Sequence, residues 1–244
     1  MTAQGDRPRR GRFITLEGPD GAGKTSQAEV LCTALRATGS TVLLVREPGG
    51  TPVGERIRDL LLAGAGAEHS ARVDALLFNA ARAALVAGIV RPALERGEIV
   101  VSARFADSTV AYQGYGGGLR IEDLRSLERF ATEGLRPDLT ILLDLPVEAG
   151  LARKSGPEVT RFEESFDVAF HRRVRDGFLA LAAAEPDRFV VIDASADPAT
   201  VGRAIAAAVA ERLPELGAVA GGASAERARG RHDEPKAAAP RIIR

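Results

Sequence analysis

Five short apolar runs divide the chain into blocks, and they limit the fold more than any other feature of the sequence. The runs occupy residues 13–16, 42–45, 99–101, 139–145 and 189–192. They are rich in β-branched residues and nearly continuous rather than alternating, which is typical of strands covered on both faces in a parallel sheet. Longer segments with helical patterning lie between them, at residues 25–38, 52–62, 71–96, 121–134, 161–184 and 197–213. The alternation predicts one doubly wound α/β domain, with a five-stranded parallel sheet flanked by helices.

Length and charge narrow the class of protein further. A chain of 244 residues, 45% of them hydrophobic, can bury one large core. Lys plus Arg and Asp plus Glu balance at 33 each, which gives no electrostatic reason to expect nucleic acid or an anionic membrane as a partner. No apolar run approaches the roughly 18 residues of a membrane-spanning helix, and the N-terminus lacks the apolar stretch of a signal peptide. We therefore expect a cytoplasmic protein.

Both ends of the chain differ in composition from the middle. Residues 1–11 are polar and basic, and we expect a disordered leader there. After residue 213 the chain is mostly Gly, Ala, Arg, Glu and Pro with few apolar side chains, the composition of a disordered segment. These boundaries predict one folded domain over residues 12–213 and a disordered tail over residues 214–244.

Cysteine and histidine are scarce, with one Cys and three His in the chain. Cys32 has no second cysteine to pair with, and its position in a predicted helix favours a core residue over a nucleophile. His69, His171 and His232 are far apart in the sequence, and we interpret them as structural or surface residues. The sequence therefore offers no Cys and His cluster for a metal.

The first apolar run leads into a glycine-rich segment that fits G-x-x-x-x-G-K-[ST], the P-loop. The segment reads Gly18-Pro19-Asp20-Gly21-Ala22-Gly23-Lys24-Thr25. Its glycines let backbone N–H groups turn inward around the phosphates of ATP, and the following helix adds the positive end of its dipole. Lys24 is expected to bridge the β- and γ-phosphates, while Thr25 and Asp20 are expected at Mg²⁺. The motif specifies phosphate binding and leaves the reaction open, although the GTPase motif N-K-x-D is absent from the sequence.

Phe78 and Arg82 are four residues apart in a predicted helix, so they share one helix face. An aromatic ring offers a stacking surface for a base, and a guanidinium one turn away can grip a phosphate with two parallel hydrogen bonds. One helix would then hold both ends of a nucleotide monophosphate. Taken alone, the pair fits a core Phe and a surface Arg better than a binding site.

Four motifs follow one another along the chain: LEGPDGAGKT at residues 16–25, REPGGT at 46–51, LLFNAAR at 76–82 and DSTVAYQG at 107–114. In order and spacing they resemble the bacterial thymidylate kinases, a family of P-loop nucleoside monophosphate kinases, and the resemblance spans about residues 13–213. It implies a three-layer P-loop NTPase fold with a short lid, Mg²⁺ as cofactor and a homodimer. The activity it implies is the ATP-dependent phosphorylation of dTMP to dTDP in dTTP synthesis.

The resemblance also implies roles for single residues around the acceptor nucleotide, dTMP. Arg82 and Arg104 would hold its phosphate, with Asp20 nearby, and Phe78 would stack on the thymine. The remaining residues of this set are Arg46 and Pro48 beside the acceptor, Thr109 and Gln113 at the base, and Tyr112 near the sugar.

Residues 150–164 resemble the family lid and carry Arg153, Lys154 and Arg161. Because the P-loop contains no arginine, the positive charge that stabilises the transferring phosphoryl group has to come from elsewhere. The resemblance therefore implies a catalytic set of Lys24, Arg104, Arg153 and Lys154.

The chain departs from the family pattern after the third apolar run. The family has Asp-Arg there, whereas this chain has Ala103 before Arg104. An acid at this strand end helps to hold Mg²⁺, and losing such a group costs about 3–4 kcal/mol of transition-state stabilisation. Three interpretations stay open: a slower enzyme, a neighbouring carboxylate (Asp20, Glu17 or Asp107) in its place, or a protein that binds nucleotides without turnover. At Gly117 the chain also lacks an arginine that the bacterial pattern usually has.

Two alternatives to a dTMP kinase follow from these residues. A related kinase would act on another pyrimidine nucleotide or on a nucleoside, although two arginines at the acceptor favour a substrate that already carries a phosphate. A non-catalytic nucleotide-binding protein would bind nucleotides and form no ADP above background.

Overall fold

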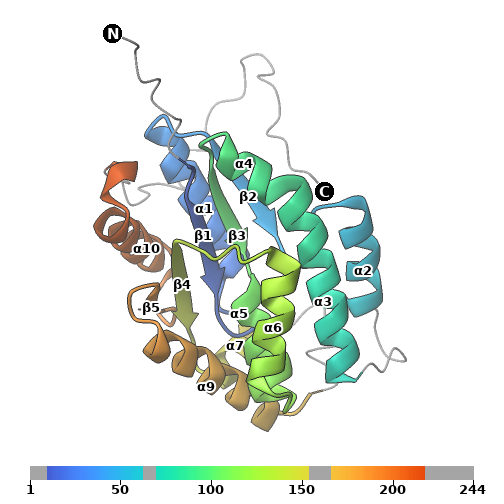
Figure 1. The fold of residues 1–244 in the computed structure, drawn as a ribbon. Coiled ribbons are helices and arrows are strands. Elements are labelled where there is room, and N and C mark those ends of the chain that lie inside the picture. Colours follow the sequence, from blue (N-terminus) through green and yellow to red (C-terminus); the bar gives the residue numbers. More distant parts are fainter. Residues whose placement is uncertain (1–9, 63–69, 154–165, 218–244) are drawn as a thin grey trace, which may run out of the picture.

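The computed structural model describes residues 10–62, 70–153 and 166–217, and its centre is one parallel sheet (Figure 1). The strands are β1 (Phe13–Glu17), β2 (Val42–Arg46), β3 (Ile99–Ala103), β4 (Leu139–Asp144) and β5 (Phe189–Asp193). They are ordered β2-β3-β1-β4-β5, and every neighbouring pair is parallel. The predicted five-stranded parallel sheet is confirmed.

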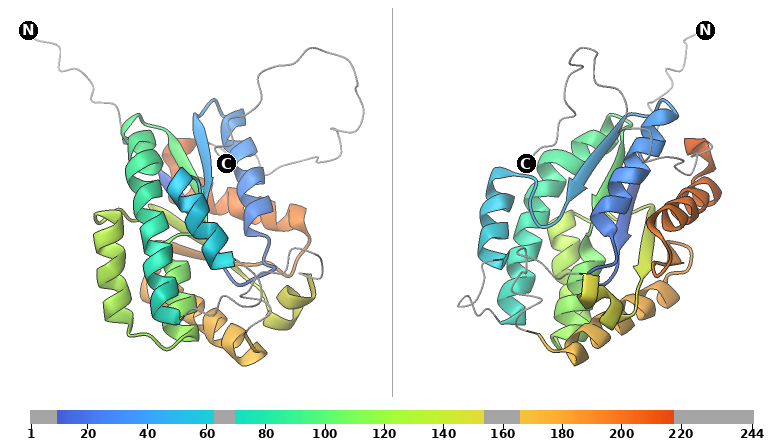
Figure 2. Two further views of the ribbon diagram at one scale, coloured as in Figure 1. Left: turned by 90° about the vertical axis from the view of Figure 1, so that its right-hand side faces the viewer. Right: turned by 180° about the vertical axis from the view of Figure 1, so that it is seen from behind.

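Helices and connecting turns of the described chain cover both faces of this sheet (Figure 2). The α-helices are α1 (Lys24–Ala37), α2 (Pro52–Leu62), α3 (Ala71–Leu85), α4 (Arg91–Glu95), α5 (Ala106–Thr109), α6 (Ile121–Thr132), α7 (Val147–Arg153), α9 (Val168–Ala184) and α10 (Pro198–Arg212). Two π-helical segments, η1 (Val86–Val90) and η2 (Val110–Gly116), and a 3₁₀ turn, η3 (Pro214–Leu216), complete the described elements.

Successive strand residues point to opposite faces, and this divides the core in two. On one face, α1 and α10 pack side by side against β1 and β4 (Figure 1). On the other face, α3, η2, α6 and α9 pack against the sheet together with the π-helical segment η1. The first core includes Ile14, Leu16, Leu31, Leu35, Ile141, Ile205 and Val209, and the second includes Phe13, Leu85, Val100, Phe105, Leu142, Val174 and Phe178.

The segment predicted as one helix over residues 71–96 is continuous but not uniform. It runs as α3, then the π-helical η1, then α4. By length and composition this helix, Ala71–Glu95, is the one candidate for a membrane span among the described residues, with a mean hydropathy of 1.7 over its best window. Its apolar residues Leu85, Val86, Val90 and Leu94 are at most 2% exposed within the protein, which identifies it as a core helix.

Three local differences from the sequence-based elements have physical causes. Residues 106–116 are helical although no helix is predicted there, because the first turns are held by tertiary contacts rather than by an apolar stripe. Residues 147–153 form α7 where the lid is predicted to begin at 150. The helix predicted from residue 161 has its described start at Val168, since the Asp167 carboxylate caps it by accepting a hydrogen bond from the Phe170 N–H at 2.7 Å.

The ordered chain also extends past the predicted domain limits at both ends. Gly11 is buried, and its N–H donates to the Leu94 carbonyl oxygen at 2.8 Å. A side chain at position 11 would meet the Glu98 carbonyl oxygen at 1.8 Å, so the close approach requires glycine. At the other end η3 packs onto the core through Leu216, and Glu215 forms an ion pair with Arg12 at 2.5 Å. The rest of the predicted leader and tail, residues 1–9 and 218–244, lies outside the described residues.

Candidate functional site

The carboxyl ends of β1, β2 and β3 meet at one edge of the sheet. Ala103, at the end of β3, is paired with Leu16 on one side and Arg46 on the other. The loops that leave these strands surround a cavity of about 410 Å³, at the edge where ligands of open α/β sheets bind. The cavity is lined by Asp20, Gly21, Gly23, Lys24, Thr25, Ser26, Arg46, Glu47, Pro48, Arg58, Leu62, Phe78, Ala103, Arg104, Ser108, Thr109, Tyr112, Gln113 and Arg153.

One end of the cavity is the turn between β1 and α1. Gly21 and Gly23 have φ angles of 75° and 84°, in the left-handed region that glycine adopts without strain. The Lys24 ammonium donates to the carbonyl oxygens of Gly18 at 2.9 Å and Pro19 at 2.7 Å, which keeps it beside the loop. Gly23 is the N-cap of α1 and provides no side-chain cap, and the first turn of the helix lines the cavity through Lys24, Thr25 and Ser26. This is the arrangement that binds phosphate.

Arg104 links the loop after β3 to the P-loop. Its Nη2 donates to Asp20 Oδ1 at 2.6 Å, and Asp20 Oδ2 accepts from the Tyr112 hydroxyl at 2.6 Å. The guanidinium lies over the Tyr112 ring at 5.1 Å. Burial alone would lower the pKa of Arg104, but Tyr112, Asp20 and Glu17 raise it above its ordinary value, so the cation is fixed.

Three arginines converge on the same side of the cavity: Arg46, Arg58 and Arg104. The carbonyl oxygen of Pro48 accepts hydrogen bonds from Arg46 at 3.3 Å and from Arg58 at 2.9 Å, and the Glu47–Pro48 peptide bond is cis. The pKa of Arg58 lies below its ordinary value, first because of burial and next because of Arg46. Cations that repel one another around a cavity favour an anion as its ligand.

Arg82 lies away from the described lining of the cavity, and its contact with the acceptor phosphate stays a prediction. It is 1% exposed and is not among the described lining residues of the cavity. Its Nε donates to Glu47 Oε2 at 2.8 Å, Nη1 to Asn79 at 3.1 Å, and Nη2 to the Phe105 carbonyl oxygen and the Thr109 hydroxyl at 3.1 Å each. The guanidinium is turned inward because Glu47, a buried carboxylate 35 residues away, needs a partner. Arg82 therefore supports the cavity wall through its hydrogen bonds to Glu47 and Thr109, which line the cavity.

The cavity lining also includes the uncharged side chains of Phe78, Thr109 and Gln113. Phe78 also packs against the core cluster on the α9 face. The Gln113 side chain is 3% exposed, and its Oε1 has no hydrogen-bond partner among the described residues. A buried acceptor without a partner favours a ligand that donates to it, because leaving it unpaired costs about 1–3 kcal/mol.

Ala103 lines the cavity, and the three carboxylates considered as replacements for the missing aspartate lie differently around it. Asp20 lines the cavity as well. The described lining includes neither Glu17 nor Asp107: Glu17 is bonded to the loop after β3, and Asp107 accepts from Arg188 at 2.7 Å and 3.0 Å. Of the three, Asp20 is the carboxylate that reaches the cavity.

Other predicted residues divide between the cavity, its surroundings and the segment outside the structure. Arg153 lines the cavity and donates to the Ala194 carbonyl oxygen at 3.1 Å. Gly18, Pro19 and Ala22 belong to the P-loop turn but not to the described lining. Lys154, Arg161 and most of the predicted lid lie outside the described residues.

Sequence reasoning missed Ser26, Glu47, Arg58, Leu62 and Ser108 as lining residues. Glu47 and Ser108 lie inside the motifs at residues 46–51 and 107–114, so membership of these motifs could have indicated them as lining residues. Nothing in the sequence around Arg58 and Leu62 indicates a binding site. They reach the cavity because the turn at Pro48 places α2 over it.

Comparisons with known proteins identify the family to which the chain is similar. The sequence model of the thymidylate kinase family matches residues 16–205. A thymidylate kinase of Thermomicrobium roseum is 52% identical over 201 residues, which cover 82% of this chain and 94% of that protein. One of Deinococcus radiodurans is 51% identical over 206 residues, covering 83% and 98%. The crystal structure of thymidylate kinase from Ehrlichia chaffeensis superposes with a TM-score of 0.63 at 35% identity, covering 75% of this chain and 93% of that one.

Proposed function

The chain belongs to the thymidylate kinase family, phosphotransferases that convert dTMP to dTDP, and on this premise we propose which of its residues hold each nucleotide. ATP takes the P-loop end of the cavity, and dTMP takes the end lined by the three arginines and Phe78. The observation that carries this division is the Arg104–Asp20 contact of 2.6 Å, since it joins the two ends.

At the donor end, Lys24 and the N-terminus of α1 bind the β- and γ-phosphates of ATP. Thymidylate kinases generally use Mg²⁺ with ATP. Thr25 is exposed on the first turn of α1 and Asp20 lines the same cavity, so a hydroxyl and a carboxylate oxygen are available to the cation directly or through water. Within the described residues no group of three His, Cys, Asp or Glu could hold a metal, which fits a cation carried largely by the phosphates. When bound, the cation neutralises charge that builds up on the transferring phosphoryl group.

At the acceptor end, Arg104, Arg46 and Arg58 bind the phosphate of dTMP. Phe78 stacks on the thymine. Gln113 accepts a hydrogen bond from the ring N–H of the base through its unpaired Oε1, with Thr109 beside it. Tyr112 lies beside the sugar, fixed by its bond to Asp20.

The transfer itself needs little covalent work from the protein. Two nucleotides are aligned so that the acceptor phosphate oxygen attacks the γ-phosphorus in line, and the bond to the β-phosphate oxygen breaks. Lys24 stays on the donor phosphates, while Arg104 and Arg153 add positive charge from the acceptor and lid sides. Lys154 remains a predicted member of this set. Ala103 supplies no carboxylate, so Asp20 is the acid we assign next to the cation.

A substrate panel tests the acceptor assignment. ADP release from Mg²⁺-ATP is measured with dTMP, dUMP, dCMP and thymidine for this protein and for Gln113→Leu. We expect dTMP to be the best acceptor, thymidine to be poor because it lacks the phosphate that the arginines bind, and Gln113→Leu to raise the KM for dTMP without changing the KM for ATP. Equal activity with thymidine and dTMP would refute the arginine site.

The apolar face formed by α3, η1 and α6 supports the predicted homodimer. It includes Leu76, Ala80, Ala83, Ala87, Leu127 and Phe130. Phe130 is 85% exposed and Leu76 53%, and an exposed apolar patch of this kind is typical of a protein interface. We propose that a second copy of the chain covers it across a two-fold axis.

We also propose a cytoplasmic location, since the apolar helix that provides this face also contributes to the core.

A further inference from the structure

Arg104 has a backbone conformation that its side chain does not favour. Its φ is 73°, in the left-handed region, which is strained for a residue with a side chain. Such a conformation persists only where neighbouring contacts impose it. The Arg104 N–H donates to the Leu16 carbonyl oxygen at 3.0 Å, and two acidic residues, Glu17 and Asp107, fix the chain that follows Arg104.

Glu17, the last residue of β1, holds the loop from the sheet side. Its Oε1 accepts from the N–H groups of Phe105 at 2.7 Å and Ser108 at 3.3 Å, and its Oε2 accepts from the Ser108 hydroxyl at 2.6 Å. The side chain is fully buried and lies outside the described cavity lining. All three of these hydrogen bonds therefore come from the segment that directly follows Arg104.

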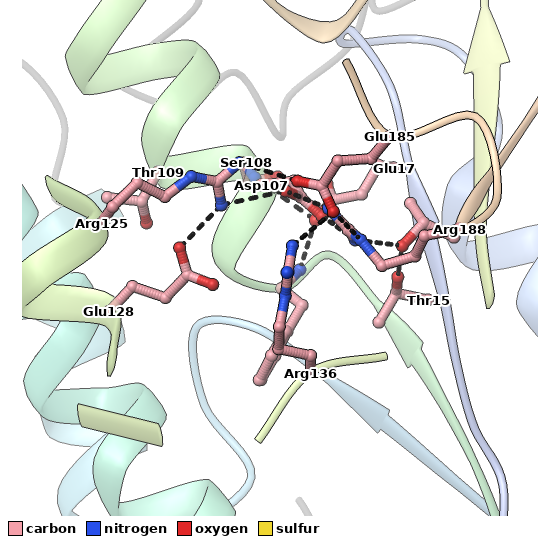
Figure 3. A network of polar contacts seen from close by, with 12 residues as sticks. Thr15, Glu17, Asp107, Ser108, Thr109, Arg125, Glu128, Arg136, Glu185 and Arg188 are labelled. Atoms are coloured by element: carbon pink, nitrogen blue, oxygen red, sulfur yellow. Dashed lines mark hydrogen bonds and ion pairs between the residues drawn. The ribbon is translucent and has the colours of Figure 1, made fainter. Parts of the chain in front are cut away.

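Asp107, in the first turn of α5, fixes the same segment through arginines of other elements (Figure 3). Its carboxylate is 2% exposed and accepts two hydrogen bonds from Arg188 and a longer one of 3.4 Å from Arg125. Arg188 also donates to the Thr140 hydroxyl at 2.7 Å, and Thr140 bonds to Thr15 at 2.9 Å across β4 and β1. The loop is thus tied to the middle of the sheet as well as to α6.

We propose that Glu17 and Asp107 are positioning residues that together hold the Arg104 loop in the shape that presents its guanidinium to the acceptor phosphate. This inference rests on the proposed function, because it takes the acceptor phosphate as the group that Arg104 binds. It assigns both acids a task other than binding metal, which fits their absence from the described lining of the cavity.

The two acids are also coupled electrostatically. The pKa of Glu17 is raised to about 7, first by burial and next by Asp107, while Ser108, Arg104 and the Phe105 N–H lower it. Asp107 and Arg104 are the charged groups that act on Glu17. Protonation as the pH falls below 7 removes a buried charge, which favours the folded state as a whole, but it leaves a weaker acceptor for the three loop donors, so the loop loosens locally. Removing the Asp107 charge lowers the pKa of Glu17 and moves this loosening to a lower pH.

The test compares the full-length protein with Asp107→Asn, Glu17→Gln and the control Glu98→Gln. Glu98 pairs with Arg96 at 2.6 Å just before β3, at the far end of the sheet from the cavity. KM values for dTMP and for ATP, and kcat, are measured across the neutral pH range. We expect Asp107→Asn and Glu17→Gln to raise the KM for dTMP about tenfold, the effect of a small misplacement of a binding group, with the KM for ATP unchanged. We expect the acid-side rise in the KM for dTMP to move to lower pH in Asp107→Asn, to disappear in Glu17→Gln and to stay in Glu98→Gln.

Equal rises in both KM values, or a dTMP KM and pH profile like those of Glu98→Gln, would overturn the inference. A second readout separates it from the proposed function. Hydrogen–deuterium exchange of a peptide covering residues 104–110 reports the loop directly, without substrate. If the protein does not use dTMP, the proposed function fails. Faster exchange in Asp107→Asn and Glu17→Gln than in Glu98→Gln then still supports the positioning role, and equal exchange overturns it.

Discussion

Arg104 and Asp20 join the loop after β3 to the P-loop through one charged hydrogen bond, with 2.6 Å between Arg104 Nη2 and Asp20 Oδ1. Asp20 belongs to the turn where we propose the donor phosphates, and Arg104 belongs to the loop where we propose the acceptor. A movement of either side chain therefore affects both ends of the cavity.

Replacing Arg104 tests its role at the acceptor. Arg104→Lys keeps the charge but loses the planar fork, so we expect the KM for dTMP to rise and kcat to fall, together by about 100-fold or more in kcat/KM. Arg104→Gly should lose as much activity. Because glycine accepts the left-handed backbone, it should cost less stability than Arg104→Ala, by about 1 kcal/mol. Steady-state kinetics and urea unfolding measure the two effects. A lysine variant with unchanged KM for dTMP would contradict the assignment.

The buried pair of Glu47 and Arg82 should matter for stability. The Nη2–Oε2 distance is 2.7 Å, and both side chains are at most 4% exposed. Arg82→Met leaves the Glu47 carboxylate without its cation, which should cost about 3–5 kcal/mol of unfolding free energy. The double variant Glu47→Gln, Arg82→Met should recover part of that loss, because no buried charge is left alone. Chemical unfolding measures the stability of the single and the double variant. Equal unfolding free energies would mean that Glu47 and Arg82 are not coupled.

Glu17 should make stability depend on pH. Its pKa is about 7 in the folded protein against an ordinary value of 4.5, so the folded state binds the proton more tightly. The stability from this group is complete below pH 4.5 and is lost as the pH rises through 7. The difference corresponds to about 3 kcal/mol. Unfolding free energies at about pH 5.5 and about pH 8 should differ more for the unmodified protein than for Glu17→Gln. The same difference in both proteins would show that another group is responsible.

The apolar face on α3 and α6 predicts the oligomeric state. Phe130→Asp puts a charge at the centre of the proposed interface, so we expect a shift from dimer to monomer in sedimentation velocity. Val30 on α1 is also an exposed apolar residue, at 42%, and lies on the opposite face of the sheet. Val30→Asp is therefore the matched control and should stay dimeric. If the unmodified protein sediments as a monomer, the proposed interface is wrong.

Local patterns were sufficient for the sheet and for most of the cavity. The strands were predictable because each is a short buried run, and Lys24 and Thr25 because the P-loop is one continuous segment. Phe78 and Arg104 could be predicted only from the resemblance carried by the four ordered motifs. The residues next to each of them in the sequence do not by themselves indicate a binding site.

The features that could not be predicted from the sequence depend on contacts between residues that are far apart in the chain. Arg82 has the right helix face for a ligand contact, yet Glu47 and the Phe105 carbonyl oxygen turn it inward. Residues 106–116 are helical without an apolar stripe, because Glu17 of β1 and Arg188 hold their first turn through Ser108 and Asp107. Such partners are separated by tens of residues, and no periodicity in the chain brings them together.

The most direct measurement is ADP formation from Mg²⁺-ATP with and without dTMP, for this protein and for Asp20→Asn. The account predicts dTMP-dependent turnover although Ala103 stands where the family has an aspartate, and a loss of about 100-fold or more in Asp20→Asn. It is contradicted if the unmodified protein forms no ADP beyond background when dTMP is added, or if Asp20→Asn turns over dTMP at the same rate.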